Sequence, residues 1–229
     1  MKRILLTAAA AGLCLFFGAT ARSQMGMNFL NRPAISDFFR PVVGGGAVYQ
    51  TVDPNSPRNG QSMEMLVVGK EMVGAKEGYW LEFSFEEKAA NGKIYSKVLV
   101  STEDFQPHRI VFQMPGGPAM EMPAQMGSRT SQKIADDLAN WTKVGTESLT
   151  VPAGTFACQH WKKKDGKGDV WVNDSISPFG MVKEISNGSS EVLVKILTGE
   201  KDHITGPVSP FNPQLFQQMM MNQAGKERQ

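Results

Sequence analysis

The sequence predicts a mainly β protein, with an antiparallel half-barrel or strongly curved sheet and one or two packing helices. The clearest observation is the strict alternation in residues 79–86, which is typical of a strand with one buried and one largely solvated face. The first set is Tyr79, Leu81, Phe83 and Phe85, and the second is Trp80, Glu82, Ser84 and Glu86. The dipeptides Asn91-Gly92 and Asp165-Gly166 favour tight hairpins. Strand patterns follow one another through short turns without a strand–helix–strand rhythm, which favours an antiparallel sheet.

Residues 1–21 are typical of a secretory signal peptide. Two basic residues precede an apolar run at 4–18, and the small residues at 19–21 suit cleavage before Arg22. A membrane anchor is the alternative, but the run is short and no later stretch is long enough to span. We therefore expect a periplasmic or secreted protein with no transmembrane segment after cleavage.

Four segments are expected. They are a signal peptide at 1–21, an N-terminal arm at 22–46, an antiparallel β domain at 47–206, and a C-terminal helix and tail at 207–229. Within the arm, Pro33 can open a short helix at 34–39, with Ile35, Phe38 and Phe39 as its apolar contacts.

About ten strands are expected in the body. The first five are 47–52, 62–71, 79–86, 93–101 and 108–114, and the rest are 141–151, 154–163, 168–173, 181–185 and 191–197. Alternation places Val98 and Val100 on one face of their strand, and Ile110 and Phe112 on one face of the next.

The segment 115–127 interrupts the strands with prolines, glycines and Met120, Met122 and Met126. It predicts an irregular apolar loop or lid, followed by a helix at 128–140. The methionines, with Met114, could ligate copper(I) through soft thioethers, but an adaptable apolar surface is the preferred interpretation. At the C-terminus, Asn212 is a candidate cap and Pro213 a candidate first residue of a helix. Its apolar stripe is Leu215, Phe216, Met219 and Met220.

Enzyme signatures are absent from the sequence, which predicts a protein that is not an enzyme and has no cofactor or metal. His108, His160 and His203 have no metal-ligand spacing. The formal net charge of +2 includes the basic leader, and no long basic block supports nucleic-acid binding. Cys158 would be the single cysteine after cleavage, and we expect a small buried side chain rather than a reactive thiol. The lysines at 162–164 and 167 suggest a solvated hairpin tip, or else a contact with anionic lipid.

The segment 151–183 carries a resemblance. The matching residues are Pro152, Ala153, Gly154, Thr155, Phe156, Asp169, Val170, Trp171, Val172, Pro178, Gly180, Val182 and Lys183. This pattern resembles exported bacterial proteins of unknown function with the lipoprotein-carrier type of fold exemplified by LolA. The resemblance implies an incomplete barrel whose apolar face holds acyl chains, with a helix at 131–140 or the C-terminal helix as plug and the Met-rich segment as lid. The carriers use an arginine for release, whereas Arg109 here alternates away from the apolar side.

These observations predict an exported, non-enzymatic protein that binds an apolar ligand or lipid-like group in a half-barrel. The candidate ligand-binding residues are Tyr79, Leu81, Phe83, Phe85, Val98, Val100, Ile110, Phe112, Met120 and Met122. The alternative is a structural or protein-interaction module of the cell envelope without a small-molecule ligand, whose terminal helix docks on a protein partner. An unrecognised hydrolase is a third hypothesis.

Overall fold

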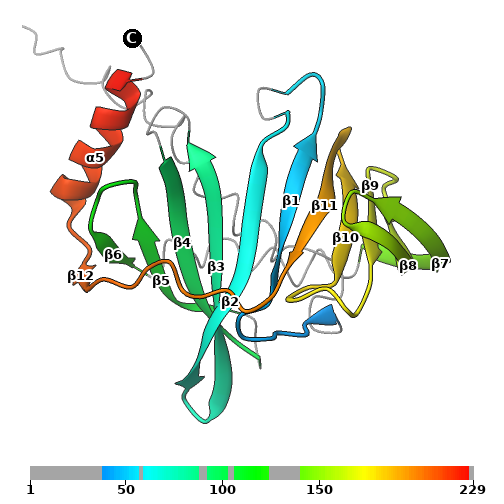
Figure 1. Cartoon of the computed structure of the whole chain (residues 1–229), viewed down its shortest axis with the longest axis horizontal. Helices are drawn as coiled ribbons and strands as arrows, with labels where there is room; N and C mark the ends of the chain where they lie inside the picture. Colours follow the sequence, from blue (N-terminus) through cyan, green and yellow to red (C-terminus); the bar gives the residue numbers. More distant parts are fainter. Residues whose placement is uncertain (1–37, 57–58, 88–91, 103–105, 124–139, 227–229) are drawn as a thin grey trace, which may run out of the picture.

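The chain folds into one open, strongly curved sheet of twelve strands, which confirms the predicted fold class (Figure 1). The computed structural model describes residues 38–56, 59–87, 92–102, 106–123 and 140–226. The strand order is β12-β6-β5-β4-β3-β2-β1-β11-β10-β9-β8-β7. Two meanders, β1 to β6 and β7 to β11, are therefore joined where β1 pairs with β11.

The first meander contains the strands of the predicted ligand-binding face. Its strands are β1 (Gly46–Val52), β2 (Ser62–Val73), β3 (Lys76–Glu87), β4 (Gly92–Ser101), β5 (Pro107–Gln113) and β6 (Ala119–Met122). Each pairs antiparallel with the next, as the short turns predict.

The second meander continues the same sheet beyond β1. Its strands are β7 (Trp141–Val151), β8 (Gly154–Lys163), β9 (Gly168–Val172), β10 (Met181–Ser186) and β11 (Ser189–Leu197). All pair antiparallel with their sequence neighbours. The strand β12 (Val208–Pro210) departs from this pattern, because it pairs parallel with β6.

The strands β6 and β12 correct the sequence prediction. β6 lies within the segment predicted to be an irregular loop or lid, so Met120 and Met122 belong to a strand that pairs with β5. With four residues between two prolines, it shows too little alternation to be read from sequence. β12 has three exposed residues, and its pairing depends on β6 being in place.

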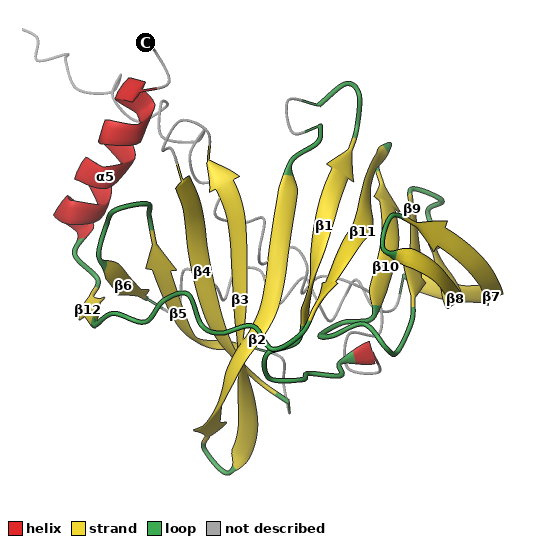
Figure 2. Cartoon of the chain, in the orientation of Figure 1, coloured by secondary structure: helices red, strands yellow, loops and turns green. Residues whose placement is uncertain are grey.

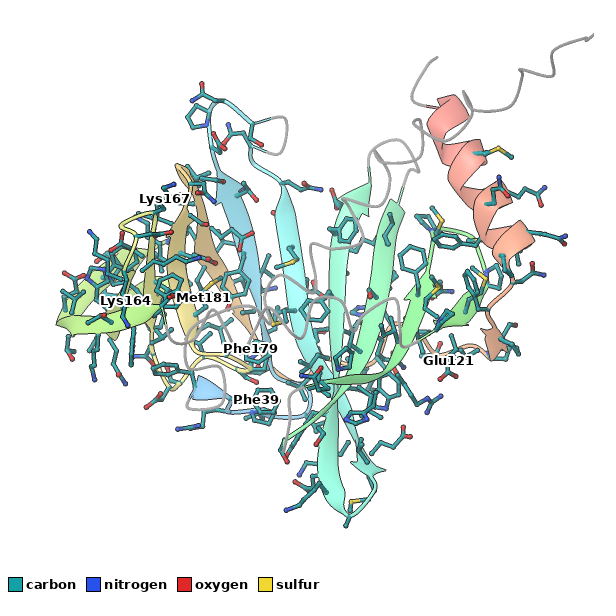
Figure 3. The ribbon with its side chains drawn as sticks, turned by 180° about the vertical axis from the view of Figure 1, so that it is seen from behind. Phe39, Glu121, Lys164, Lys167, Phe179 and Met181 are labelled. Atoms are coloured by element: carbon teal, nitrogen blue, oxygen red, sulfur yellow. The ribbon has the colours of Figure 1, made fainter. Side chains whose placement is uncertain are left out.

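The inner face of the sheet is defined here as the face that carries Leu81 and Phe83 of β3. Its buried side chains come from both meanders and form one cluster with Phe38 and Phe39. Phe39 contacts Tyr79 and Phe179, with ring centroids 5.6 Å and 5.2 Å apart. Figure 3 labels Phe39 and Phe179, which lie close together. Phe38 and Phe39 thus make apolar contacts as predicted, whereas Ile35 and the rest of residues 34–37 of that expected helix lie outside the described ranges.

The outer face carries Trp80, Glu82 and Ser84, and a strap formed by residues 198–207 crosses it from β11 to β12 (Figure 2). Ile204 of the strap is buried against Val111 and Ala119. The prediction that this face of β3 is largely solvated was wrong for Glu82 and Ser84, which are 1% and 2% exposed. The strap covers a surface that the alternation within β3 alone describes as polar.

The helix α5 (Pro213–Lys226) follows β12, and its start is as predicted. The Asn212 side chain accepts hydrogen bonds from the backbone N–H groups of Gln214 and Leu215 at 3.0 Å and 3.1 Å. These bonds satisfy donors that have no partner within the helix, and Pro213 has no such donor to satisfy. The helix predicted at 128–140 lies outside the described residues, apart from Asn140 in a turn. Within the described ranges, no helix combines the length and apolar character that crossing a membrane requires.

Candidate ligand-binding face

All ten predicted ligand-binding residues lie on the inner face of β3 to β6. Across β3 and β4, Tyr79 is opposite Val100 and Leu81 is opposite Val98. The register then places Val98 opposite Ile110, which in turn is opposite Met122. Phe112 and Met120 form the next pair, and Phe83 and Phe85 complete the surface on β3. The result is a largely apolar surface four strands wide, in which Ser96 of β4 lies between Phe83 and Phe112.

These residues are packed rather than exposed. Nine of them are at most 8% exposed, and Met122 is half-buried. Six belong to the main cluster, and Phe85 and Phe112 form a second cluster with Ile94 and Met114. Ligand binding by this face stays a prediction, because the burial of a side chain alone is equally expected of a structural core.

The helix α5 packs on the second cluster, at one end of the inner face. Phe216 contacts Phe112 with ring centroids 6.0 Å apart, and Met219 packs against the same group. Gly117 accommodates this contact, because a Cβ atom there would lie 2.6 Å from the Met219 Cε. Phe216 and Met219, two residues of the predicted apolar stripe, therefore pack against other parts of the same chain.

The outer face behind these strands is held by charged groups. Glu82 receives hydrogen bonds from the strap: its carboxyl lies 2.6 Å from Nδ1 of His203 and 3.2 Å from the backbone N of His203. Burial raises the pKa of Glu82, and the neighbouring Asp202 raises it further, while His203 opposes the shift. Asp202 is in turn bound to Lys97. The strap thus fixes β3 and β4 from behind.

Arg109 lies on this outer face, as its alternation predicts. It binds Glu121 through two nitrogens at 2.8 Å and 3.1 Å, and Glu71 at 3.1 Å. The guanidinium holds the pKa of Glu121 below its usual range. Arg109 therefore projects from the side of β5 opposite to the apolar surface.

His160 has partners that sequence spacing did not reveal. Its ring stacks on Trp171 with centroids 4.4 Å apart, Nε2 lies 2.7 Å from Asp169, and Nδ1 lies 3.2 Å from Glu147. These partners come from β9 and β7, which flank His160 on both sides. Both ring nitrogens are occupied by carboxylates, so the cluster positions a histidine without offering it to a substrate.

Cys158 is fully buried in the main cluster, as predicted. Burial, assisted by the charge of Glu147, raises the pKa of its thiol to about 11. The thiol therefore stays protonated near neutral pH and is a poor nucleophile.

The described residues contain no group of three His, Cys, Asp or Glu side chains that could hold a metal ion. Of the four methionines considered as copper(I) ligands, Met126 lies outside the described residues. Met114 and Met120 are buried in the packing of the apolar face.

Two tryptophans at the far end of the inner face were not singled out from sequence. The Nε1 atoms of Trp141 on β7 and Trp161 on β8 are buried, and neither has a hydrogen-bond partner among the described residues. Both rings pack against the main cluster. The signal in the sequence was their position on opposite strands of one hairpin, each two residues from a lysine.

No protein-family model matches the chain, and neither does any curated protein. Among solved structures it is similar to a candidate lipoprotein from Parabacteroides distasonis, with 14% identity, coverage of 69% of this chain and 97% of the other, and a TM-score of 0.34. A candidate exported protein with a YmcC-like fold from Bacteroides fragilis gives 12% identity, coverage of 69% and 98%, and a TM-score of 0.34. A DUF1329 family protein from Desulfovibrio piger gives 13% identity, coverage of 79% and 89%, and a TM-score of 0.28. Scores this low assign neither a family nor an activity.

Proposed function

We propose that this chain is an exported, non-enzymatic protein that binds an apolar, lipid-like ligand on the inner face of its open sheet. The observation that carries the proposal is the largely apolar surface of β3 to β6, with α5 packed on one end. An acyl chain needs such a surface, because its binding is driven by removal of apolar area from water. The leader-like residues 1–21 support export to the periplasm or the medium.

The first test is the lipid content of the protein. The chain from Arg22 onward should be purified without detergent and its organic extract examined by mass spectrometry. We expect a stoichiometric lipid-like species, or uptake of a fluorescent fatty acid by the delipidated protein. A protein that carries no lipid and takes up none would contradict the proposal, and a protein partner that co-purifies instead would favour an envelope interaction module.

Two neighbouring residues of β5 provide a matched pair of variants. Ile110 faces the apolar surface and Val111 faces the strap, and both are buried. Ile110→Ala should weaken binding of the fluorescent fatty acid, whereas Val111→Ala should leave it unchanged. Both changes should lower the free energy of unfolding, by about 2–5 kcal/mol for Ile110→Ala and less for Val111→Ala. Equal effects of the two variants on binding would mean that the inner face plays no special part.

A further inference from the structure

The end of the inner face formed by β7 and β8 carries two buried hydrogen-bond donors. The indole Nε1 atoms of Trp141 and Trp161 are shielded from solvent, and no acceptor among the described residues reaches either. Trp171 on the opposite face differs, because its indole nitrogen donates to Glu147. A buried donor without an acceptor is costly, and such groups in native proteins call for a specific reason.

The strand register brings the two tryptophans together with two lysines. Trp141 is opposite Lys163, and Lys143 is opposite Trp161. Residues two apart on a strand share a face, so all four side chains emerge on one side of the hairpin. The two tryptophans are diagonal neighbours, roughly 7–8 Å apart at their backbones. Two indole donors and two cations thus alternate on one small area.

This area is continuous with the apolar face. Trp161 is opposite Val170, which is buried in the main cluster, and its ring meets Phe38 edge-on with centroids 6.0 Å apart. Phe39, the next residue, contacts Tyr79 of the apolar face. Phe38 and Phe39 therefore connect the two indoles to the apolar face through a series of ring contacts.

The indole of Trp141 is held in place across the hairpin. Its ring lies over Gly168 of β9, where a Cβ atom would be 3.1 Å from Cη2, and the Lys163 ammonium lies 5.8 Å from its ring centroid. Glu184 is two strands from Trp161 on the same face, across Val170. In the strand register, Lys143 and Lys163 are therefore nearer to the two tryptophans than Glu184 is.

We propose that Trp141 and Trp161 bind the oxyanion head group of a single-chain amphiphile, with Lys143 and Lys163 supplying positive charge. A carboxylate or the dianion of a phosphate monoester offers acceptors but no donors, which matches two N–H groups beside two ammonium groups. This inference rests on the proposed function, since the apolar inner face would hold the acyl chain. It adds that the ligand is an anion and fixes which end of the sheet its head occupies.

Calorimetric titration of the delipidated chain with dodecanoate, dodecyl phosphate and dodecan-1-ol separates the head group from the tail. We expect both anions to bind at least about tenfold more tightly than the alcohol, since hydrogen bonds to charged groups are the stronger ones. Acetate and inorganic phosphate serve as the free anions. Binding of these without binding of dodecan-1-ol would show a simple anion site and overturn the assignment to an amphiphile.

The variants Trp141→Phe and Trp161→Phe keep an aromatic ring and remove the donor. Each should reduce the preference for dodecanoate over dodecan-1-ol to about twofold while leaving the affinity for the alcohol nearly unchanged. Trp171→Phe makes the same change on the opposite face and should leave the preference intact. The thermal midpoint of each variant shows that it is folded, and double substitution of Lys143 and Lys163 by Gln tests the charge independently of the aromatic rings.

The outcomes separate this inference from the proposed function. Equal affinity for dodecanoate and dodecan-1-ol in the unmodified chain would overturn the head-group site while supporting an apolar ligand. No binding of any chain-bearing compound would overturn both. A preference for the anions that survives all four substitutions would place the head group elsewhere.

Discussion

Nδ1 of His203 lies 2.6 Å from Oε1 of Glu82, although 121 positions separate these residues in the sequence. The Glu82 side chain is 1% exposed and belongs to a central strand, whereas the histidine belongs to the strap. This contact links the last part of the chain to the back of the apolar face. It also places an ionisable group where ionisation is costly.

The pKa of Glu82 is raised above its ordinary value of 4.5, and this predicts the sign of a pH effect. A raised pKa means that the folded state holds the proton more tightly than the unfolded state does. The resulting stabilisation is complete below the ordinary pKa and is lost as pH rises through the higher folded pKa. Glu82→Gln cannot ionise, so its free energy of unfolding should lack this decline when denaturation is followed from pH 4 to pH 8.

Glu121→Gln is the matched control, with the opposite sign. Arg109 lowers the pKa of Glu121, so the ionised form stabilises the fold above the ordinary pKa and this contribution is lost as pH falls through the lowered one. The pair is partly exposed, and we expect an effect below about 1 kcal/mol. Parallel pH profiles for Glu82→Gln and the unmodified chain would contradict the role assigned to Glu82.

Cys158 should be unreactive in the folded protein. Its thiol is fully buried, and its pKa is raised to about 11. In a chain that starts at Arg22, an aromatic disulfide reagent at pH 8 should release almost no chromophore from the native protein, and one equivalent after unfolding in guanidinium chloride. Fast reaction without denaturant would show that the end of the sheet around β8 opens readily.

Asn212 should contribute measurably to the start of α5. Its side-chain oxygen accepts two backbone N–H groups, and removing such a cap costs about 1 kcal/mol. Asn212→Ala should therefore speed amide hydrogen exchange in the first turn of α5. Asn212→Ser should retain protection, and Gln217→Ala, an exposed change in the same helix, should have little effect. Unchanged exchange in Asn212→Ala would indicate that packing of Phe216 alone fixes the first turn.

Gly168→Ala tests the position of the Trp141 ring. The new methyl would lie 3.1 Å from Cη2, so the indole must shift and the fluorescence of Trp141 should change. Gly145→Ala on β7, the strand that carries Trp141, is the control, because a Cβ there meets nothing within 4 Å. We expect Gly168→Ala to lower the thermal midpoint and Gly145→Ala to leave it nearly unchanged. Equal midpoints would mean that the ring adjusts at no cost.

Local patterns predicted the architecture well where structure depends on neighbouring residues. Alternation in β3 identified one face of the sheet, and Asn212 with Pro213 identified the start of α5. The hairpin at Asp165-Gly166 joins β8 and β9 as expected, with Gly166 at φ 73°. These features need only the preferences of a few consecutive residues.

The remaining features depend on contacts that no local pattern contains. Glu82 was expected to face solvent because its own strand cannot reveal a strap that comes from residue 198 onward. The carboxylates around His160 come from two other strands, and the unpaired indoles are defined by what surrounds them. Such contacts follow from the topology of the sheet. Local patterns therefore predicted the apolar face, but they predicted neither the charged groups behind it nor the buried indole donors at its end.

The strap restricts the order in which the parts of the sheet can fold. Its anchors lie on strands β3 to β6, and β12 can pair only with a β6 that is already aligned. Strand β1 likewise cannot complete its pairing until β11 has formed, so the native pairing joins distant parts of the chain. Such long-range pairing is a property of slowly folding β proteins. A nascent chain that ends before residue 198 would leave Glu82, Val111 and the edge of β6 uncovered. We therefore expect such intermediates to require protection from association until residues 198–210 emerge.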